Sequence, residues 1–113
     1  TAARLTYDPE EITHTLLKFL NEPRIKTWFE RKKGREILQE AEFVNEKGAL
    51  NLMDRIVVDP DQITLIEFKT GGKMSFYATQ MKNYRQILEQ IYKGKPAVCY
   101  WAYVDSARVE EVS

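Results

Sequence analysis

Hydrophobic side chains recur at helical spacing in the first part of the chain. Between residues 12 and 20 they fall three or four positions apart, directly after Asp8-Pro9-Glu10-Glu11. That tetrapeptide offers an N-cap, a proline at the first helical position and a capping-box glutamate, so a helix is predicted to begin there. Residues 21–23 break the pattern, and a shorter helical piece through Trp28 is predicted to end near Gly34.

Three strand-like segments follow. Residues 36–44 alternate in polarity, and residues 50–59 and 62–70 are two further strand-like runs. Asn45-Glu46-Lys47-Gly48 is expected to turn the chain between the first two. Asp59-Pro60-Asp61-Gln62 is expected to turn it between the second two, because proline pre-sets φ and aspartate can bond its own backbone. Three antiparallel strands are therefore predicted.

The last third of the chain returns to helical and then to strand spacing. The hydrophobic residues between 77 and 91 form the stripe of a helix that packs on a sheet. Residues 96–105 are a nearly continuous apolar strand, as in a sheet-central position, and residues 108–112 add an edge strand. The order predicts an α/β (α+β) sandwich: a mixed sheet of about four to five strands, an N-terminal helix and a helix after the central hairpin.

The length and net charge of the chain limit the classes of protein to which it can belong. With 113 residues, the chain is predicted to form one domain, residues 1–113. Its 17 basic and 17 acidic side chains cancel, so any attraction to nucleic acid must be local. Basic residues cluster at positions 31–35, although a charge run is usually a solvated face. The first residue, Thr1, is not methionine, and we expect a fragment of a longer protein.

The use of cysteine and apolar residues indicates a compartment. Cys99 is the only cysteine, which excludes a disulfide within the chain and a cysteine-ligated iron–sulfur cluster. The longest apolar stretch, residues 97–104, is far too short to span a membrane, and no signal peptide is recognisable. We therefore expect a cytoplasmic protein with no membrane partner.

The second predicted hairpin brings two carboxylates together. If residues 60–61 form its loop, Asp54 lies directly opposite Glu67. Opposed residues share a face with Cβ atoms roughly 4.5–5.5 Å apart, close enough for both carboxylates to hold one cation. Alternation puts Lys69 on that face and Phe68 on the other. Because facing carboxylates repel each other, the pair indicates a metal or a proton between them.

These groups suit metal-assisted phosphodiester hydrolysis. Carboxylate oxygens prefer hard cations such as Mg²⁺ or Mn²⁺, which hold a phosphate oxygen and activate a bound water. The Lys69 ammonium would lie beside that water, where it can stabilise the pentacovalent charge, lower the pKa of the water or, partly desolvated, act as base. Either motif alone occurs often by chance, so the shared strand face is what makes a candidate site.

A set of acidic, basic and aromatic positions matches one nuclease motif: Asp54, Glu67-x-Lys69-Thr70-Gly71 and Gln80-x-x-x-Tyr84. The run resembles the PD-(D/E)xK nuclease superfamily, and within it the RecB-type nuclease domain that ends AddA/RecB-like helicases of the UvrD class. The likeness spans most of the chain. Met53 replaces the proline of the family's name, and Glu67 replaces the aspartate usual in RecB-type members.

This resemblance implies a restriction-endonuclease-like core and a Mg²⁺- or Mn²⁺-dependent DNA nuclease of recombination or repair, associated with the nucleoid. Residue by residue, it implies that Asp54 and Glu67 bind the metal, with the carbonyl of Phe68 as an additional ligand. It implies that Lys69 is catalytic.

The resemblance also implies a supporting helix. Gln80 and Tyr84 lie one helical turn apart and share a face, so both can reach the site and the DNA. Tyr84 belongs to the hydrophobic stripe as well, and can bury its ring while presenting its hydroxyl. Lys73, Lys82 and Arg85 are candidate phosphate contacts, with ordinary solvation as an equally good account.

Two further residues match the family. His14 is similar to the histidine of the first helix that joins the metal shell, but it lies opposite the hydrophobic stripe, where a solvent-facing role is the alternative. Glu40 resembles the glutamate that precedes the metal-aspartate strand, and is a candidate catalytic residue. An even loop at residues 45–48 would pair Glu40 with Met53 on the wrong face, so this role requires a bulge or an odd loop.

Two functions from different classes stay open. The first is an exonuclease-like DNA nuclease domain that acts on strands delivered by a helicase motor elsewhere in the parent protein, because the chain has no phosphate-binding loop motif of its own. The second is a catalytically inactive DNA-binding or docking module of the same fold. A sequence-specific endonuclease is less favoured, since a chain of this size has little surface left for reading bases.

Overall fold

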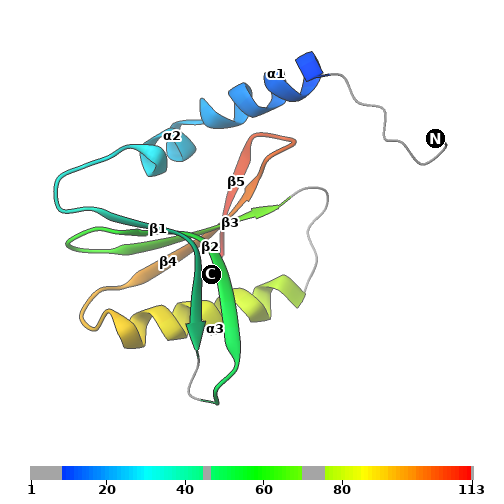
Figure 1. The fold of residues 1–113 in the computed structure, drawn as a ribbon. Coiled ribbons are helices and arrows are strands. Elements are labelled where there is room, and N and C mark those ends of the chain that lie inside the picture. The colour runs from blue at the N-terminus through cyan, green and yellow to red at the C-terminus, as the bar shows by residue number, and fades with distance from the viewer. Residues whose placement is uncertain (1–8, 45–46, 70–75, 113) are drawn as a thin grey trace.

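The computed structural model describes residues 9–44, 47–69 and 76–112 of the chain (Figure 1). In chain order, these residues form eight helices and strands: α1 (Pro9–Leu20), α2 (Pro23–Phe29), β1 (Glu36–Val44), β2 (Leu50–Val58), β3 (Ile63–Lys69), α3 (Phe76–Ile91), β4 (Ala97–Tyr103) and β5 (Arg108–Val112).

The described strands form one mixed sheet in the order β1-β2-β3-β4-β5. β1, β2 and β3 are antiparallel neighbours, β3 and β4 are parallel, and β5 returns antiparallel at the edge. The parallel pair requires a long connection, and α3 lies within it. The predicted α+β class, the three antiparallel strands and the edge strand are confirmed.

The two faces of the sheet carry separate cores (Figure 1). On one face, Phe19 of α1 and Trp28 of α2 pack against Val57. On the other face, Met81 of α3 packs with Leu65. Because side chains of a strand alternate between faces, this division fixes which side of the sheet each strand residue reaches.

The register of the β2–β3 hairpin agrees with the sequence prediction. Val57 pairs with Thr64 and Val58 with Ile63, as the predicted loop requires. The Asp59 N–H donates to the Gln62 carbonyl at 2.9 Å and closes the turn. This register places the two candidate carboxylates on neighbouring strands.

The β1–β2 hairpin bends sharply near its middle (Figure 1). Glu40 lies at the bend with a φ of 47°, a left-handed conformation that residues with a Cβ rarely adopt. Leu38 and Ala41 both pack against the α3 core, although they are three positions apart in one strand. The bend therefore inverts the alternation of side chains along β1.

Two boundary expectations need correction. α2 ends at Phe29 and not near Gly34, because Glu30 has an extended backbone. Gly34 instead has a φ of 82° before β1, and a Cβ there would lie 3.3 Å from Pro60 Cγ. In α1 only Phe19 is buried, so most of the predicted hydrophobic stripe stays exposed.

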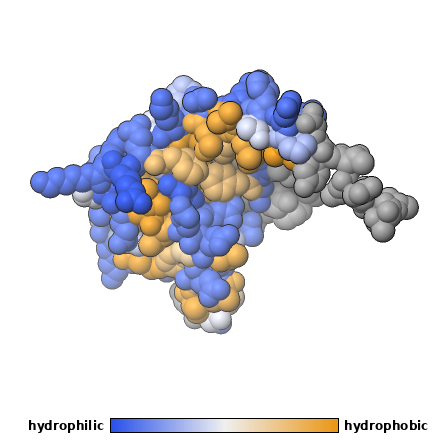
Figure 2. Space-filling view, turned by 45° about the horizontal axis from the view of Figure 1, so that its top comes forward, coloured by the Kyte–Doolittle hydropathy of each residue, from blue (hydrophilic) through white to orange (hydrophobic). Residues whose placement is uncertain are grey.

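The exposed stripe gives the α1 side of the molecule a hydrophobic surface (Figure 2). It consists of four side chains: Ile12, Leu16, Leu17 and Leu20. The N-cap position predicted for Asp8 lies outside the described residues. In the part of the chain that the structure describes, no helix has the length and apolar character needed to cross a membrane.

Candidate active site

The carboxylates of Asp54 on β2 and Glu67 on β3 each accept a hydrogen bond from a backbone N–H of the other strand. The Asp54 N–H donates to Glu67 Oε2 at 2.7 Å, and the Phe68 N–H donates to Asp54 Oδ2 at 3.0 Å. The backbone pairing of β2 with β3 ends one residue earlier, at Arg55 and Ile66. Side-chain carboxylates thus replace backbone carbonyls as acceptors here, and each uses only one of its two oxygens in these bonds.

Glu67 lies in a buried position that disfavours its charge. Only 4% of the residue is exposed, and the pKa of its carboxyl is raised from 4.5 to about 7, chiefly by burial. The negative charge of Asp54 contributes to this rise, whereas the bond from the Asp54 N–H and the charge of Lys69 oppose it. A carboxyl with such a pKa exchanges its proton near neutral pH and gains from a bound cation.

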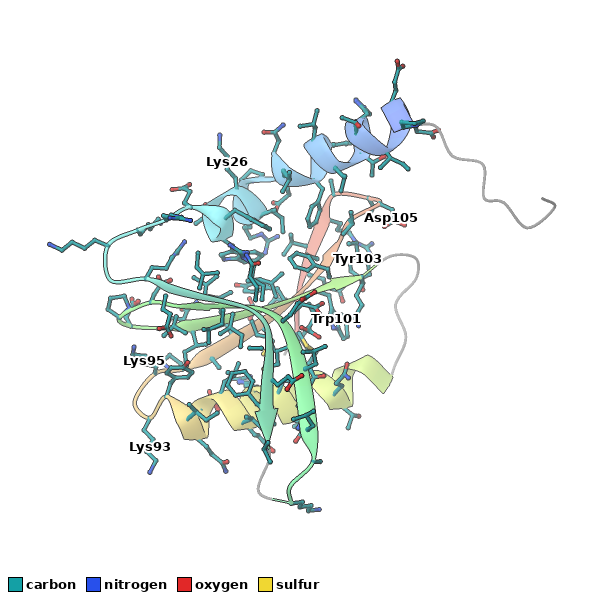
Figure 3. The ribbon with its side chains drawn as sticks, in the orientation of Figure 1. Lys26, Lys93, Lys95, Trp101, Tyr103 and Asp105 are labelled. Carbon is teal, nitrogen blue, oxygen red and sulfur yellow. The ribbon has the colours of Figure 1, made fainter. Side chains whose placement is uncertain are left out.

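The apolar wall beside Glu67 comes from β4. In the parallel register Glu67 pairs with Trp101 and Lys69 with Tyr103. Both aromatic side chains are buried, and Figure 3 labels them along β4. Paired residues of parallel strands share a face, so these rings exclude water from the side of the acidic pair.

Lys69 and Phe68 project to opposite faces, as predicted. Lys69 is half-buried, and its charge acts on the pKa of Glu67, which places its ammonium within electrostatic reach of the acidic pair. The Phe68 ring instead meets Phe19 edge-on at 6.0 Å, in the core on the α1 side. In a strand the N–H and the carbonyl of one residue point to the same edge, so the Phe68 carbonyl also points toward β2.

The α3 helix brings Tyr84 to the site. Tyr84 is buried, and its pKa is raised first by burial and then by the charges of Glu67 and Asp54. Asn83 donates to Asn51 Oδ1 at 3.3 Å and links α3 to β2. Gln80, one turn earlier, is exposed. Tyr84 thus lies where the sequence placed it, on the buried side of α3, and Gln80 occupies an exposed position of the same helix.

Glu40 reaches the site through the bend of β1. Gln39 pairs with Arg55 and Ala41 with Met53, so Glu40 lies opposite Asp54. The connection between the strands, residues 45–49, has the odd length that this role requires. Glu40 and Asp54 line one cleft of about 430 Å³.

The strained backbone of Glu40 gives a stability prediction. Glycine adopts a positive φ without the steric cost of a Cβ, so Glu40→Gly is expected to raise the free energy of unfolding by about 1 kcal/mol. Urea denaturation measures it. The matched control is Glu42→Gly, in a regular part of β1, whose free energy of unfolding should fall by about 0.5–1 kcal/mol. If the free energy of unfolding fell equally in both variants, the backbone of Glu40 would not be strained.

The structure does not bring His14 to the acidic pair. Its side chain is exposed, and the described residues around it, such as Glu10 and Leu17, all belong to α1. Across the described residues, no three His, Cys, Asp or Glu side chains are close enough together to hold a metal ion. The solvent-facing alternative for His14 is confirmed. Lys73 lies outside the described residues.

Arg55 is the residue that sequence reasoning missed. Only 4% of it is exposed, its guanidinium lies 4.0 Å from the centre of the Phe29 ring, and it lines the same cleft as Asp54. A signal was present in the sequence, because Arg55 places a second charge directly after Asp54 and before the apolar run of residues 56–58. Buried arginines of this kind are unusual without a partner.

No family model matches the chain, and no match is found among curated proteins. The function of the chain is therefore inferred from the arrangement of its side chains.

Proposed function

We propose that this chain is a divalent-metal-dependent DNA nuclease domain of the PD-(D/E)xK type, with a restriction-endonuclease-like core. The observation that supports it best is the pair Asp54 and Glu67, bonded across two neighbouring strands with the charge of Lys69 beside them. The chemistry is hydrolysis of a phosphodiester bond.

The donor atoms fit a hard divalent cation. Asp54 and Glu67 each keep one carboxylate oxygen outside their bonds to the backbone, and the Phe68 carbonyl points to the same edge. Oxygen ligands of this kind suit Mg²⁺ and Mn²⁺. When bound, such an ion supplies a polarised phosphate oxygen and a water of lowered pKa. Asp54, Glu67 and the Phe68 carbonyl are the groups that would hold it.

Lys69 supplies the positive charge that the reaction needs. Lys69 pairs with the buried Tyr103 of β4, and its charge acts on Glu67 in surroundings where charges interact more strongly than in water. There it stabilises negative charge that develops on the phosphate in the transition state. Tyr84 of α3 is buried, and the charges of Glu67 and Asp54 raise its pKa, so it lies within electrostatic reach of the acidic pair.

The wider setting is part of the same proposal. A helicase motor elsewhere in the parent protein or complex delivers a DNA strand, and the domain degrades it from the end during recombination or repair in the cytoplasm. The neutral net charge fits this arrangement, because a tethered domain has a high effective concentration and needs little affinity of its own.

One observation favours the alternative, a docking module without chemistry. Asp54 and Glu67 each accept a backbone N–H, so the pair already has a structural role in joining β2 to β3 without a metal. In that case Glu67 would simply hold its proton below about pH 7.

Calorimetry with Mn²⁺ separates the two functions. The wild-type chain is expected to give a saturable heat, and Asp54→Asn to lose it, because the amide keeps the bond from the Phe68 N–H but removes the charge. With Mn²⁺ present, the wild type should also shorten an end-labelled single-stranded oligonucleotide. Asp61→Asn in the exposed β2–β3 turn is the control for loss of one charge. A wild type without heat and without cleavage would favour the docking module.

A further inference from the structure

A cavity of about 790 Å³ lies between α2, β1 and β2, next to the acidic site. Four of its lining residues are basic: Arg31, Lys32, Arg35 and Arg55. The cavity shares the side chains of Phe29, Gln39 and Arg55 with the smaller cleft that contains Glu40 and Asp54. The basic cavity and the acidic cleft therefore share a wall.

Arg55 is a buried cation without a carboxylate partner in the part of the chain that the structure describes. Among the described residues its guanidinium donates only to the Trp28 carbonyl, at 3.3 and 3.4 Å, and packs over the Phe29 ring. Burial and the nearby charge of Arg35 both lower its pKa, which shows that its surroundings disfavour the cation. A buried charge is costly unless it is paired, so this position gains from an anion in the cavity.

Arg35 also lines the cavity, but its positive charge is balanced by a carboxylate. It bonds Asp59 with two nitrogens, at 2.7 and 3.1 Å, and donates to the carbonyls of Thr27 and Glu30. Its charge is therefore already balanced, and its role is to hold α2 and the β2–β3 turn in place. The uncompensated positive charge of the cavity comes from Arg55 and from the exposed Arg31 and Lys32.

We propose that this cavity binds the phosphate backbone of a single DNA strand and leads the strand to Asp54 and Glu67, with Arg55 as a phosphate-contacting residue. The inference deepens the proposed function, and the description of the strand as a substrate depends on it. Arginine suits this role because its planar guanidinium pairs with two phosphate oxygens at once. The Phe29 ring, 39% exposed at the shared wall, offers a surface on which a base can stack.

The test measures binding without chemistry. Fluorescence anisotropy of a labelled single-stranded oligonucleotide of mixed sequence is recorded in EDTA, over a range of salt concentrations, for the 113-residue chain and its variants. Arg31→Ala/Lys32→Ala removes two exposed charges of the cavity. It is expected to weaken binding at low salt at least about tenfold and to reduce the slope of log K against log salt by about 1.4, or 0.7 for each phosphate contact.

The control removes the same charge elsewhere. Lys93→Ala/Lys95→Ala changes the connection between α3 and β4, which lies away from α2 (Figure 3), and should leave affinity and slope near the wild-type values. Arg55→Gln is expected to weaken binding as well, with its fold checked by circular dichroism. If that variant does not fold, the double variant at Arg31 and Lys32 carries the test alone.

The outcomes separate this inference from the nuclease proposal. Loss of binding in the cavity variants only, with no metal-dependent cleavage by the wild type, would support a strand-binding cavity and reject the nuclease. Cleavage by the wild type, with equal affinity and slope in the cavity and control variants, would overturn the cavity and leave the nuclease standing. A wild type that does not bind the oligonucleotide in EDTA also overturns the inference.

Discussion

Lys69→Met is expected to lower the rate of DNA cleavage by about 100- to 1,000-fold, the usual effect of removing one group that stabilises transition-state charge. Methionine keeps most of the apolar stem of the half-buried side chain and removes the ammonium. Since Asp54 and Glu67 stay in place, the variant should still fold and bind Mn²⁺. Gel assays on a labelled single strand, beside calorimetry with Mn²⁺, measure both properties.

The pH profile gives this variant a second readout. The charge of Lys69 lowers the pKa of Glu67, so its removal should raise that pKa and shift Mn²⁺ binding toward higher pH. Lys93→Met, at an exposed position after α3, is the control and should keep the wild-type rate and profile. Cleavage by Lys69→Met at the wild-type rate would remove Lys69 from the mechanism.

The register of the β2–β3 hairpin was predictable because a hairpin has a simple parity. Once Asp59 and Gln62 close the turn, the opposed pairs from Val58 with Ile63 to Arg55 with Ile66 follow, and period-two alternation places Lys69 and Phe68 on opposite faces. The hydrophobic stripe of α3 predicted the position of Tyr84 for the same reason, because the regular period of a helix determines which way each side chain points. Regular geometry is what local sequence encodes best.

The bend at Glu40 was not predictable in the same way. It depends on one residue in a left-handed conformation, and nothing in its neighbours requires that conformation locally. The alternative faces of Glu40 therefore stayed open until the register of β1 against β2 was known. The end of α2 escaped prediction for a related reason, because the extended backbone at Glu30 precedes the glycine that was expected to end the helix.

The basic cavity depends on contacts between residues far apart in sequence. Arg55 meets Trp28 and Phe29 of α2, and Arg35 meets Asp59 in the β2–β3 turn. Sequence alone showed only a run of charges, for which solvation is the ordinary explanation. The burial of Arg55 and its lack of a carboxylate partner among the described residues are tertiary facts, and they separate a binding wall from a solvated face.

Glu67→Gln is expected to raise the free energy of unfolding by about 3 kcal/mol at about pH 8, measured without metal. The folded-state pKa of Glu67 is about 7, above the ordinary value of 4.5, so the native chain holds this proton more tightly than the unfolded chain. As pH rises between these two values, the unfolded state loses its proton first and stability falls. Glutamine carries no charge and can still accept the Asp54 N–H, so the variant avoids this loss.

Urea denaturation across this pH window measures the effect. The difference between Glu67→Gln and the wild type should be small below about pH 4.5, grow through the window and level off above pH 7. Glu42→Gln, an exposed position on β1, is the control, and its difference should stay within about 0.5 kcal/mol throughout. A difference for Glu67→Gln that does not change with pH would contradict the raised pKa.

When Mn²⁺ is added to the same experiment, the wild type should become more stable than Glu67→Gln. A ligand that binds only the native state stabilises it by RT ln(1 + [L]/Kd), and the wild-type chain alone has both carboxylates of the proposed metal site. The wild type is therefore expected to gain stability with Mn²⁺ at high pH, where Glu67 is ionised, and to lose that gain as protons compete below about pH 7. If Mn²⁺ left both chains unchanged, Glu67 would be a buried structural acid, and the docking module would be the better account of the domain.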